Sequence, residues 1–169
     1  MSHPFNLKNP IHILATGFYS GLIKPAPGTW GTLAAAIIYT FALSTMPLIA
    51  FWLITLVSCI AGIYICGKTA KDSGSHDHGS IVWDEFAGYW LTLAIISFII
   101  GGHVHLYWQI GAFLLFRFFD ILKPFPIGLL DKRIGGGFGI MLDDLIAGAY
   151  AAGILYGAMY AYGYFVVYM

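Results

Sequence analysis

Carboxylates stand in two clusters within a chain that is otherwise strongly apolar. All eight acidic residues lie between Asp72 and Asp144. Hard divalent cations such as Mg²⁺ prefer carboxylate oxygens, and ionisable groups in membrane-embedded chains mark functional sites. We therefore predict one Mg²⁺ site with ligands from both clusters: Asp84, Glu85, Asp120, Asp143 and Asp144. Within this set, Asp84, Asp143 and Asp144 are also the candidate catalytic carboxylates.

Two further segments carry cations and a hydroxyl that could bind phosphate. The sequence KPAPGTWGT predicts a helix that begins near Thr29, with Thr29 as its N-cap and Lys24 beside it. Arg117, Asp120 and Lys123 are three residues apart and would share one helix face. An ordinary helix start and an i,i+3 ion pair are the simpler interpretations. The functional interpretation assigns phosphate binding to Lys24, Thr29, Arg117 and Lys123.

Two histidines and a glycine-rich segment are weaker signals. His76 and His78 precede Asp84 and are candidates for phosphate contact or for proton donation in catalysis. Solvated loop histidines are the simpler interpretation. Residues 135–139, with the sequence GGGFG, could form a loop whose backbone N–H groups bind an anion, or a merely flexible connection.

The composition is typical of a membrane protein. The chain has 169 residues, of which 59% are hydrophobic and 9% charged, and its mean hydropathy is +0.80. A soluble domain carries about 25% charged residues, so much of this surface must face lipid. The length suits a single domain over residues 1–169. A formal net charge of zero gives no basis for binding nucleic acid.

The apolar runs predict an all-α, polytopic membrane helical bundle with about five apolar helices. A spanning helix needs about 20 residues. The candidate runs are Thr29–Met46, Leu48–Cys66, Phe86–Gly101, Val104–Phe119 and Leu145 to the C-terminal region. The third and fourth runs are short, so they extend into their polar flanks or cross incompletely. The stretch Ile11–Ile23 is short and interrupted by glycine, which predicts an N-terminal interfacial or re-entrant helix.

The positions of lysine and arginine predict the orientation. Cytoplasmic connections of membrane proteins are enriched in these residues. All eight lie before the first run, between the second and third runs, at the end of the fourth run or before the fifth. The two remaining connections contain none. The N-terminus and both acidic clusters are therefore predicted on the cytoplasmic side, and the C-terminus outside.

The two acidic clusters share a short sequence pattern. Asp84 stands four residues before Gly88, and Asp144 stands four residues before Gly148. This spacing puts aspartate and glycine on one helix face, and glycine lets a neighbouring helix approach closely. We expect the two helices to meet at the glycines and to bring the acids together. A pair of acidic helix caps is the simpler alternative.

These features favour metal-assisted phosphoryl transfer at a membrane surface. Carboxylates alone would repel a phosphate, whereas carboxylates that hold a divalent metal beside lysine and arginine attract it. Either a water molecule or an aspartate could attack the phosphorus. A site at the membrane interface predicts a lipid phosphate as the substrate.

The motifs resemble the phosphatidylglycerophosphatase A family over most of the chain. They are HILATGF at 12–18, PGT at 27–29, HDHGSIVWDE at 76–85, KPFPI at 123–127 and DDLIAG at 143–148. The resemblance implies a Mg²⁺-dependent, multi-pass enzyme of the bacterial inner membrane with its active site facing the cytoplasm. Such an enzyme hydrolyses phosphatidylglycerophosphate in the cytoplasmic leaflet to phosphatidylglycerol and phosphate, in phosphatidylglycerol and cardiolipin biosynthesis.

Two rival functions are compatible with the residues. A small cation transporter would also carry intramembrane carboxylates, but near the bilayer midplane rather than at helix starts on one side. A phosphatase for other lipid phosphates would share the same site. The spaced aspartates with Ala-Arg of the CDP-alcohol phosphotransferases are absent, as is the Ser-Gly-His signature of the other large membrane phosphatase superfamily. No oligomeric state is predicted.

Overall fold

The computed structural model is built from helices. It describes residues 5–74, 78–131 and 133–168, and no strand occurs among them. The predicted all-α class is therefore confirmed. In chain order the elements are α1 (Pro10–Ala15), η1 (Ser20–Leu22), α2 (Pro27–Phe41), η2 (Leu43–Thr45), α3 (Leu48–Ser73), α4 (Trp83–Ile100), α5 (Leu106–Leu122), α6 (Ile127–Asp131) and α7 (Gly136–Tyr168).

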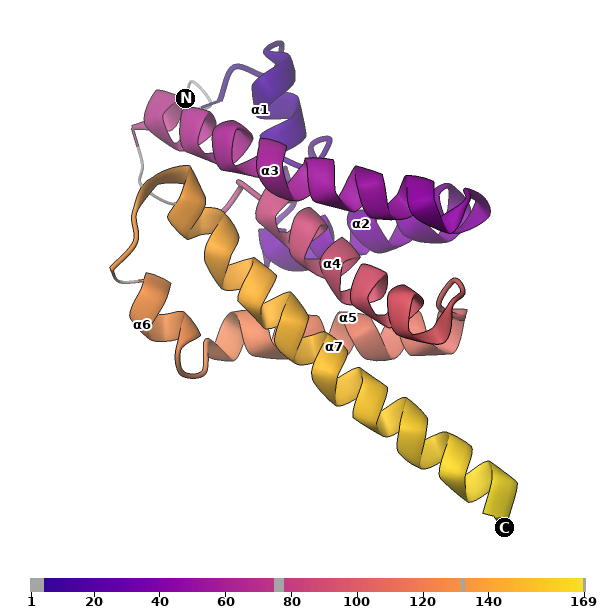
Figure 1. The fold of residues 1–169 in the computed structure, drawn as a ribbon. Coiled ribbons are helices and arrows are strands. Elements are labelled where there is room, and N and C mark those ends of the chain that lie inside the picture. Colours follow the sequence, from indigo (N-terminus) through magenta and orange to yellow (C-terminus); the bar gives the residue numbers. More distant parts are fainter. Residues whose placement is uncertain (1–4, 75–77, 132, 169) are drawn as a thin grey trace.

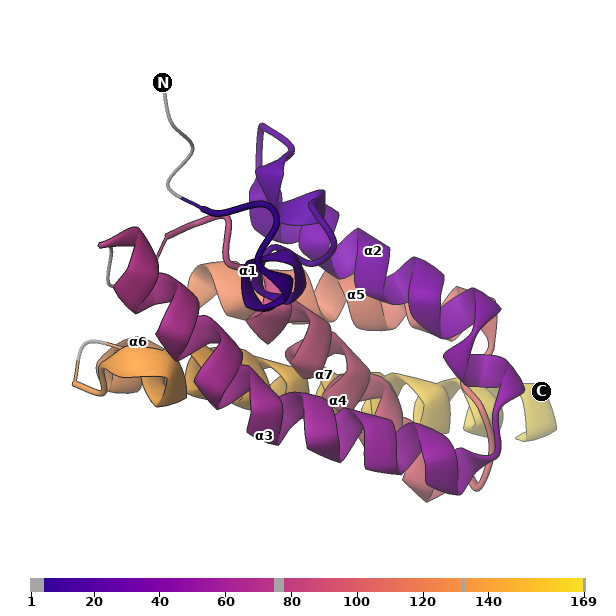
Figure 2. The ribbon, with the colours of Figure 1, turned by 90° about the horizontal axis from the view of Figure 1, so that it is seen from above.

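Two helical hairpins and one long helix form the bundle (Figure 1, Figure 2). The turns from α2 to α3 and from α4 to α5 lie at one end of the bundle, and α7 crosses the other helices diagonally. The opposite end gathers the starts of α2, α4 and α7 and the ends of α3 and α5. We call it the charged end, because the acidic residues that the structure describes lie in these helix ends and in α6. The two acidic clusters thus share one end, as expected.

α4 is the central helix of the bundle. It packs against α2, α3, α5 and α7. Phe86, Tyr89, Leu93 and Ile96 are fully buried, and a helix that is apolar all round is typically buried in this way. Because α4 contacts every other long helix, its first turn is held close to the end of α5 and the start of α7.

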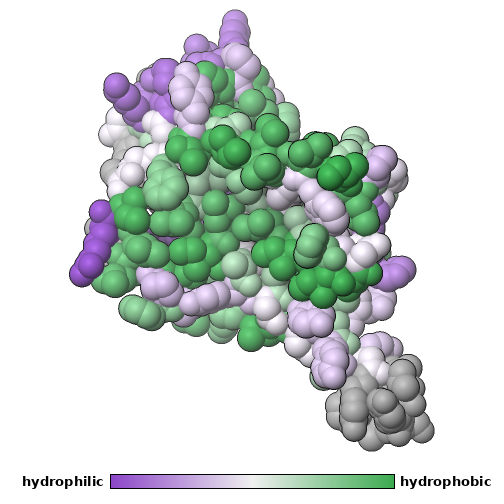
Figure 3. Space-filling view, viewed as in Figure 1, coloured by the Kyte–Doolittle hydropathy of each residue, from purple (hydrophilic) through white to green (hydrophobic). Residues whose placement is uncertain are grey.

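The surface of the bundle is strongly apolar. On α3, exposed fractions of 38–63% are found for large apolar side chains: Ile49, Leu53, Leu56, Val57, Ile60, Ile63 and Tyr64. Hydrophobic residues cover most of the visible face in Figure 3, and hydrophilic ones gather toward the charged end. In the part of the chain that the structure describes, three helices are long and apolar enough to cross a membrane: α3, α4 and α7 up to Gly163. Exposed apolar surface of this extent is expected of helices that contact lipid.

The structure corrects the expected number of spans, because three helices reach the required length rather than five. The run Thr29–Met46 forms the 15-residue α2, and the run Val104–Phe119 forms the 17-residue α5, both shorter than α4, which with 18 residues is the shortest of the three candidate spans. The stretch Ile11–Ile23 is not one helix either. Its backbone reverses after α1, where three consecutive residues have positive φ: Gly17, Phe18 and Tyr19.

Candidate active site

α4 and α7 cross in direct contact at two glycines. A Cβ atom on Gly148 would lie 2.5 Å from the carbonyl oxygen of Gly88, and one on Gly88 would lie 2.7 Å from the carbonyl oxygen of Asp144. The Thr92 hydroxyl donates to the carbonyl of Gly148 at 3.1 Å. Each glycine follows an aspartate by four residues, so the crossing places Asp84 beside Asp144. The predicted close approach of these helices is confirmed.

Three nearly buried carboxylates meet beside this crossing. One oxygen from each of Asp84, Glu85 and Asp144 lies within 4.8 Å of the other two, and the residues are only 3–9% exposed. Among the described residues, Glu85 Oε2 and Asp144 Oδ2 have no hydrogen-bond partner. Negative charges this close repel each other strongly where water is excluded. The cluster therefore requires a cation or protons, and its hard oxygen donors fit Mg²⁺.

Arg117, near the end of α5, faces this carboxylate cluster. Its Nη1 lies 3.6 Å from Glu85 Oε1 and also pairs with Asp120. Gly28, in the first turn of α2, packs against both partners of this contact, Glu85 and Arg117. A Cβ there would collide with Glu85 and would lie 3.0 Å from both terminal nitrogens of Arg117. α2 therefore begins against the site, with the positive end of its helix dipole nearby.

Lys123 and Asp143 form an ion pair beside the cluster. Lys123 directly follows α5, and its Nζ lies 2.5 Å from Asp143 Oδ2 and 3.2 Å from Asp131 Oδ1. Burial acts to lower the pKa of Lys123, but the hydrogen bonds and negative charges of the two aspartates outweigh it and raise that pKa. The ammonium group therefore stays charged. Asp143 Oδ1 also accepts the backbone N–H of Asp144 at 3.1 Å, which steadies the turn that carries the third cluster carboxylate.

Known proteins are similar in sequence to this chain over most of its length. The family model for phosphatidylglycerophosphatase A matches residues 13–159. The chain belongs to the phosphatidylglycerophosphatase A family. It is 50% identical over 155 residues to phosphatidylglycerophosphatase A of Haemophilus influenzae, covering 92% of each chain. It is 45% identical over 150 residues to phosphatidylglycerophosphatase A of Escherichia coli, covering 89% of this chain and 84% of that one.

Membership of the phosphatidylglycerophosphatase A family confirms the enzyme class expected from the sequence, a phosphoric monoester hydrolase. A third relative, from Bacteroides thetaiotaomicron, is 35% identical over 144 residues, which is 82% of this chain and 87% of that one. It carries the provisional name phosphatidylinositol-3-phosphatase. No solved structure matches the chain.

The structure divides the five predicted metal ligands of this phosphatidylglycerophosphatase A family member into two groups. Asp84, Glu85 and Asp144 meet in the cluster. Asp120 and Asp143 lie beside it, and each pairs with a neighbouring cation. Asp120 also interacts electrostatically with Glu85 and Asp144. These two aspartates lie beside the three-carboxylate group, and their role as metal ligands stays a prediction.

Two of the predicted phosphate-binding residues lie at the start of α2. Lys24 is exposed in the turn that precedes the helix. Thr29 is the third residue of α2, so its prediction as the N-cap is wrong. The N-cap is Ala26, and Pro27 occupies the first helical position. The physical reason is that proline has the φ angle of a helix and no N–H to satisfy, so it starts the helix earlier than the hydroxyl does.

The histidines contribute little to the described geometry. The ring of His78 packs edge-on against Phe5, with centroids 4.9 Å apart, and its Nδ1 accepts the backbone N–H of Ser80 at 3.2 Å. These contacts match the simpler interpretation of a loop histidine, and a role in proton donation stays a prediction. His76 lies outside the described residues.

The glycine-rich segment is helical, so the predicted anion-binding loop is wrong. α7 begins at Gly136. A Cβ on Gly67 of α3 would lie 3.1 Å from the Cα of Gly137, and a Cβ on Gly137 would collide with the carbonyl oxygen of Ile63. The glycines therefore allow α7 to pack closely on α3. This packing offsets the low intrinsic helix propensity of glycine.

Sequence reasoning missed the contribution of Gly28, for which the Pro-Gly pair at a helix start was the available signal. It also missed a buried polar contact that fixes α1 on α3. His12 Nε2 lies 3.1 Å from Asp72 Oδ2, while His12 Nδ1 accepts the backbone N–H of Asn6 at 3.0 Å. Asp72 also pairs with Lys68 one turn earlier. A single histidine in an apolar segment gave no indication of its partner.

Proposed function

We propose that this protein hydrolyses phosphatidylglycerophosphate to phosphatidylglycerol and inorganic phosphate in a Mg²⁺-dependent reaction. The observation that carries the proposal is the buried carboxylate cluster that faces an arginine at the charged end of a membrane bundle. The names of the Haemophilus influenzae and Escherichia coli relatives support this substrate. The reaction would supply phosphatidylglycerol, from which cardiolipin is also made.

In this proposal Asp84, Glu85 and Asp144 hold the metal. When bound, a divalent metal withdraws negative charge from the phosphate oxygens and so makes the phosphorus easier to attack. The unpaired oxygens Glu85 Oε2 and Asp144 Oδ2 support the assignment, because buried carboxylates without a partner are costly unless a cation satisfies them. The cluster alone would repel the substrate.

Arg117 binds the phosphate group from the side of α5. A guanidinium can donate two parallel hydrogen bonds to phosphate oxygens, and negative charge spreads over these oxygens during phosphoryl transfer. Asp120 pairs with Arg117 and so orients it. The first turn of α2 at Gly28 adds the positive end of a helix dipole. Lys123 adds positive charge beside Asp143.

A carboxylate of the site accepts a proton from the attacking water, and Asp84 and Asp143 are the candidates. The water oxygen forms a new bond to phosphorus, the bond between phosphorus and the glycerol oxygen breaks, and that oxygen takes up a proton to become a hydroxyl group. Direct attack by an aspartate, followed by hydrolysis, is the alternative route to the same products.

We propose that α3, α4 and α7 cross the inner membrane of a bacterium, with the charged end at the cytoplasmic face. The distribution of lysine and arginine supports this orientation. The phosphate head group would then reach the site from the cytoplasmic leaflet while the acyl chains stay in the bilayer. Cation transport is disfavoured because the cluster lies at the end of the bundle. The name of the Bacteroides relative favours a second candidate, hydrolysis of other lipid phosphates.

The test is phosphate release from phosphatidylglycerophosphate by the detergent-purified protein, with Mg²⁺ and with EDTA. The Asp84→Asn variant should lose both phosphate release and Mg²⁺ binding measured by calorimetry. The matched control is Asp131→Asn, which removes a carboxylate from α6 outside the cluster and should leave Mg²⁺ binding unchanged. Release that persists in EDTA, or in Asp84→Asn, would refute the assignment.

A further inference from the structure

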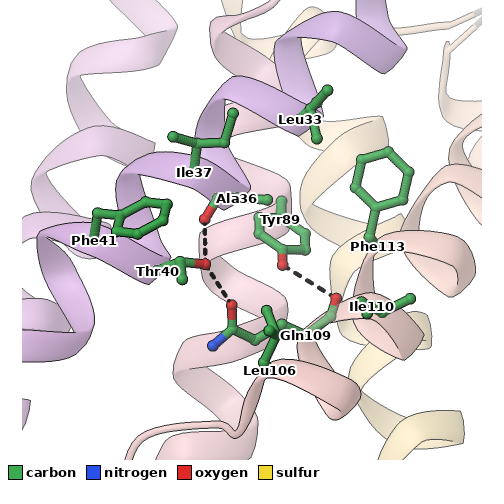
Figure 4. Close-up of a pocket in the computed structure, with 10 residues that line it drawn as sticks. All are labelled: Leu33, Ala36, Ile37, Thr40, Phe41, Tyr89, Leu106, Gln109, Ile110 and Phe113. Atoms are coloured by element: carbon green, nitrogen blue, oxygen red, sulfur yellow. Dashed lines mark hydrogen bonds between the residues drawn. The ribbon is translucent and has the colours of Figure 1, made fainter.

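An apolar groove of about 340 Å³ lies between α2, α4 and α5 (Figure 4). Leu33 and Ile37 form the α2 wall, Ile110 and Phe113 form the α5 wall, and Tyr89 of α4 lies between them. The volume is in the range of pockets that hold small ligands. Leu33, Ile37 and Ile110 are 39–56% exposed, so the groove is open on the lateral surface of the bundle.

The polar side chains of the groove bind one another. The Tyr89 hydroxyl donates to the backbone carbonyl of Gln109 at 3.2 Å, and the Thr40 hydroxyl lies 2.7 Å from Gln109 Oε1. Gln109 Nε2 in turn donates to the carbonyl of Val104 at 2.7 Å. Because these groups satisfy each other, the groove offers mainly carbon surface to an occupant. A hydrocarbon chain fits that surface, whereas a polar ligand would find few free partners.

Each helix that lines the groove also carries, one turn nearer the charged end, a residue at the candidate active site. On each helix, a residue of the site or of its predicted phosphate-binding set stands four positions from a groove residue, which places the two on one face. The pairs are Thr29 and Leu33 on α2, Glu85 and Tyr89 on α4, and Arg117 and Phe113 on α5. A chain lying in the groove would therefore point its polar end toward Arg117 and the carboxylate cluster.

The length of the groove matches one membrane leaflet. The α2 wall is about 12 Å long from Leu33 to Phe41, and the helical turn between Thr29 and Leu33 adds about 6 Å. The total of about 18 Å is close to half of the roughly 30 Å hydrocarbon core of a bilayer. α4, which forms the floor, is long and apolar enough to cross that core.

We propose that this groove holds one acyl chain of the lipid substrate and so orients the phosphate head group in the active site. The inference rests on the proposed function, because the occupant is part of the proposed substrate. Hydrocarbon gains little free energy by leaving bilayer lipid for an apolar groove. The groove therefore acts by fixing position, which raises the rate of reaction more than it raises affinity.

A second apolar groove, of about 410 Å³ between α3 and α4, provides the control. Gly62 lies one turn of α3 beyond this groove toward the charged end, and there Met141 and Trp83 pack into the space beside it. A Cβ on Gly62 would lie 2.5 Å from the Met141 sulfur and 3.0 Å from the Trp83 ring. Ala94 in this groove and Ala36 in the first are both half-buried alanines that line an apolar groove. Tryptophan at either position fills the space.

The first test compares Ala36→Trp with Ala94→Trp on phosphatidylglycerophosphate with oleoyl chains and with hexanoyl chains. Ala36→Trp should lower kcat/KM for the oleoyl substrate about tenfold, because the head group loses its orientation. The hexanoyl substrate should be hydrolysed at the wild-type rate, and Ala94→Trp should match wild type on both. An equal loss on both substrates, or no loss on either, would overturn the proposal.

The second test uses the wild-type protein, so it does not depend on a variant that folds. A phosphatidylglycerophosphate analogue with a diazirine in one acyl chain should label α2 and α5 along the groove after irradiation. Unlabelled phosphatidylglycerophosphate should suppress this labelling, whereas phosphatidylcholine with the same chains should not. Labelling of α3 as strong as that of α2 and α5, or labelling suppressed equally by both lipids, would refute the groove. Failure of the proposed function gives a different result, absence of phosphate release from either chain length.

Discussion

Replacing Gly148 by alanine would test whether the crossing of α4 and α7 sets the geometry of the site. The added Cβ would lie 2.5 Å from the carbonyl oxygen of Gly88, whereas ordinary van der Waals contacts begin near 3.4 Å. The difference is 0.9 Å, and the nearest atom belongs to a backbone that cannot rotate away. The two helices must therefore separate by an amount of this order.

The separation would move Asp144 away from Asp84 and Glu85, whose oxygens now lie within 4.8 Å of one another. Overpacking of a helix contact costs about 1–3 kcal/mol of stability, and misplacement of catalytic groups by about 1 Å costs about 100-fold in rate. We expect kcat/KM to fall about 10- to 100-fold. The Mg²⁺ concentration that gives half-maximal activity should rise at the same time.

The matched control is Gly153→Ala on the same helix. No atom lies within 4 Å of a Cβ at this position, and alanine favours the helix by up to about 1 kcal/mol. This variant should keep its activity. The assay is phosphate release from phosphatidylglycerophosphate over a Mg²⁺ titration, with circular dichroism to confirm folding. If Gly148→Ala behaved like Gly153→Ala in this assay, the crossing would not determine the site.

Three further changes test other parts of the reasoning. Gly28→Ala inserts a methyl group against Arg117 and should lower activity about tenfold; unchanged phosphate release would contradict the contact. Asp144→Asn removes one of three repelling buried charges, so it should raise Tm in EDTA while abolishing phosphate release. Mg²⁺ should raise the Tm of the wild type, since it binds the folded state, and should have no effect on this variant; a parallel shift would argue against the cluster as the metal site. His12→Phe keeps an aromatic ring but removes the contact with Asp72, together with the acceptor for the Asn6 backbone N–H, and should cost about 1–2 kcal/mol of unfolding free energy, measured by denaturant titration with activity retained. No loss of stability would mean that this contact does not hold α1.

The pairing of the two acidic clusters could be predicted because it depends on spacing alone. An aspartate four residues before a glycine marks one face of a helix wherever that helix lies. Two such pairs, at Asp84 and Asp144, were sufficient to predict which helices meet and which carboxylates face each other. The common end of the bundle followed from the absence of lysine and arginine in the other two connections.

The i,i+3 pair of Arg117 with Asp120 follows from spacing, but helix boundaries and the ion pairs between separate elements could not be predicted, because both depend on tertiary contacts. Hydropathy does not show that α2 ends at Phe41 or that the backbone reverses after α1. The helical state of Gly137 depends on its packing against Gly67 of another helix. The assignment of Asp143 to Lys123 depends on where α5 ends, since Lys123 is the residue at which the chain leaves that helix with φ near 43°.

Glycine links the stability of this bundle to its chemistry. Within a membrane, helix association depends on close packing rather than on the hydrophobic effect, and Gly88 and Gly148 allow that packing between α4 and α7. The same two residues bring carboxylates together whose mutual repulsion opposes association. Gly28 repeats the pattern, because α2 can reach Arg117 and Glu85 only where it has no side chain. A cation in the cluster would therefore contribute twice, by completing the active site and by removing the repulsion that works against the helix crossing. This predicts that loss of the metal loosens the crossing itself and not only the chemistry that depends on it.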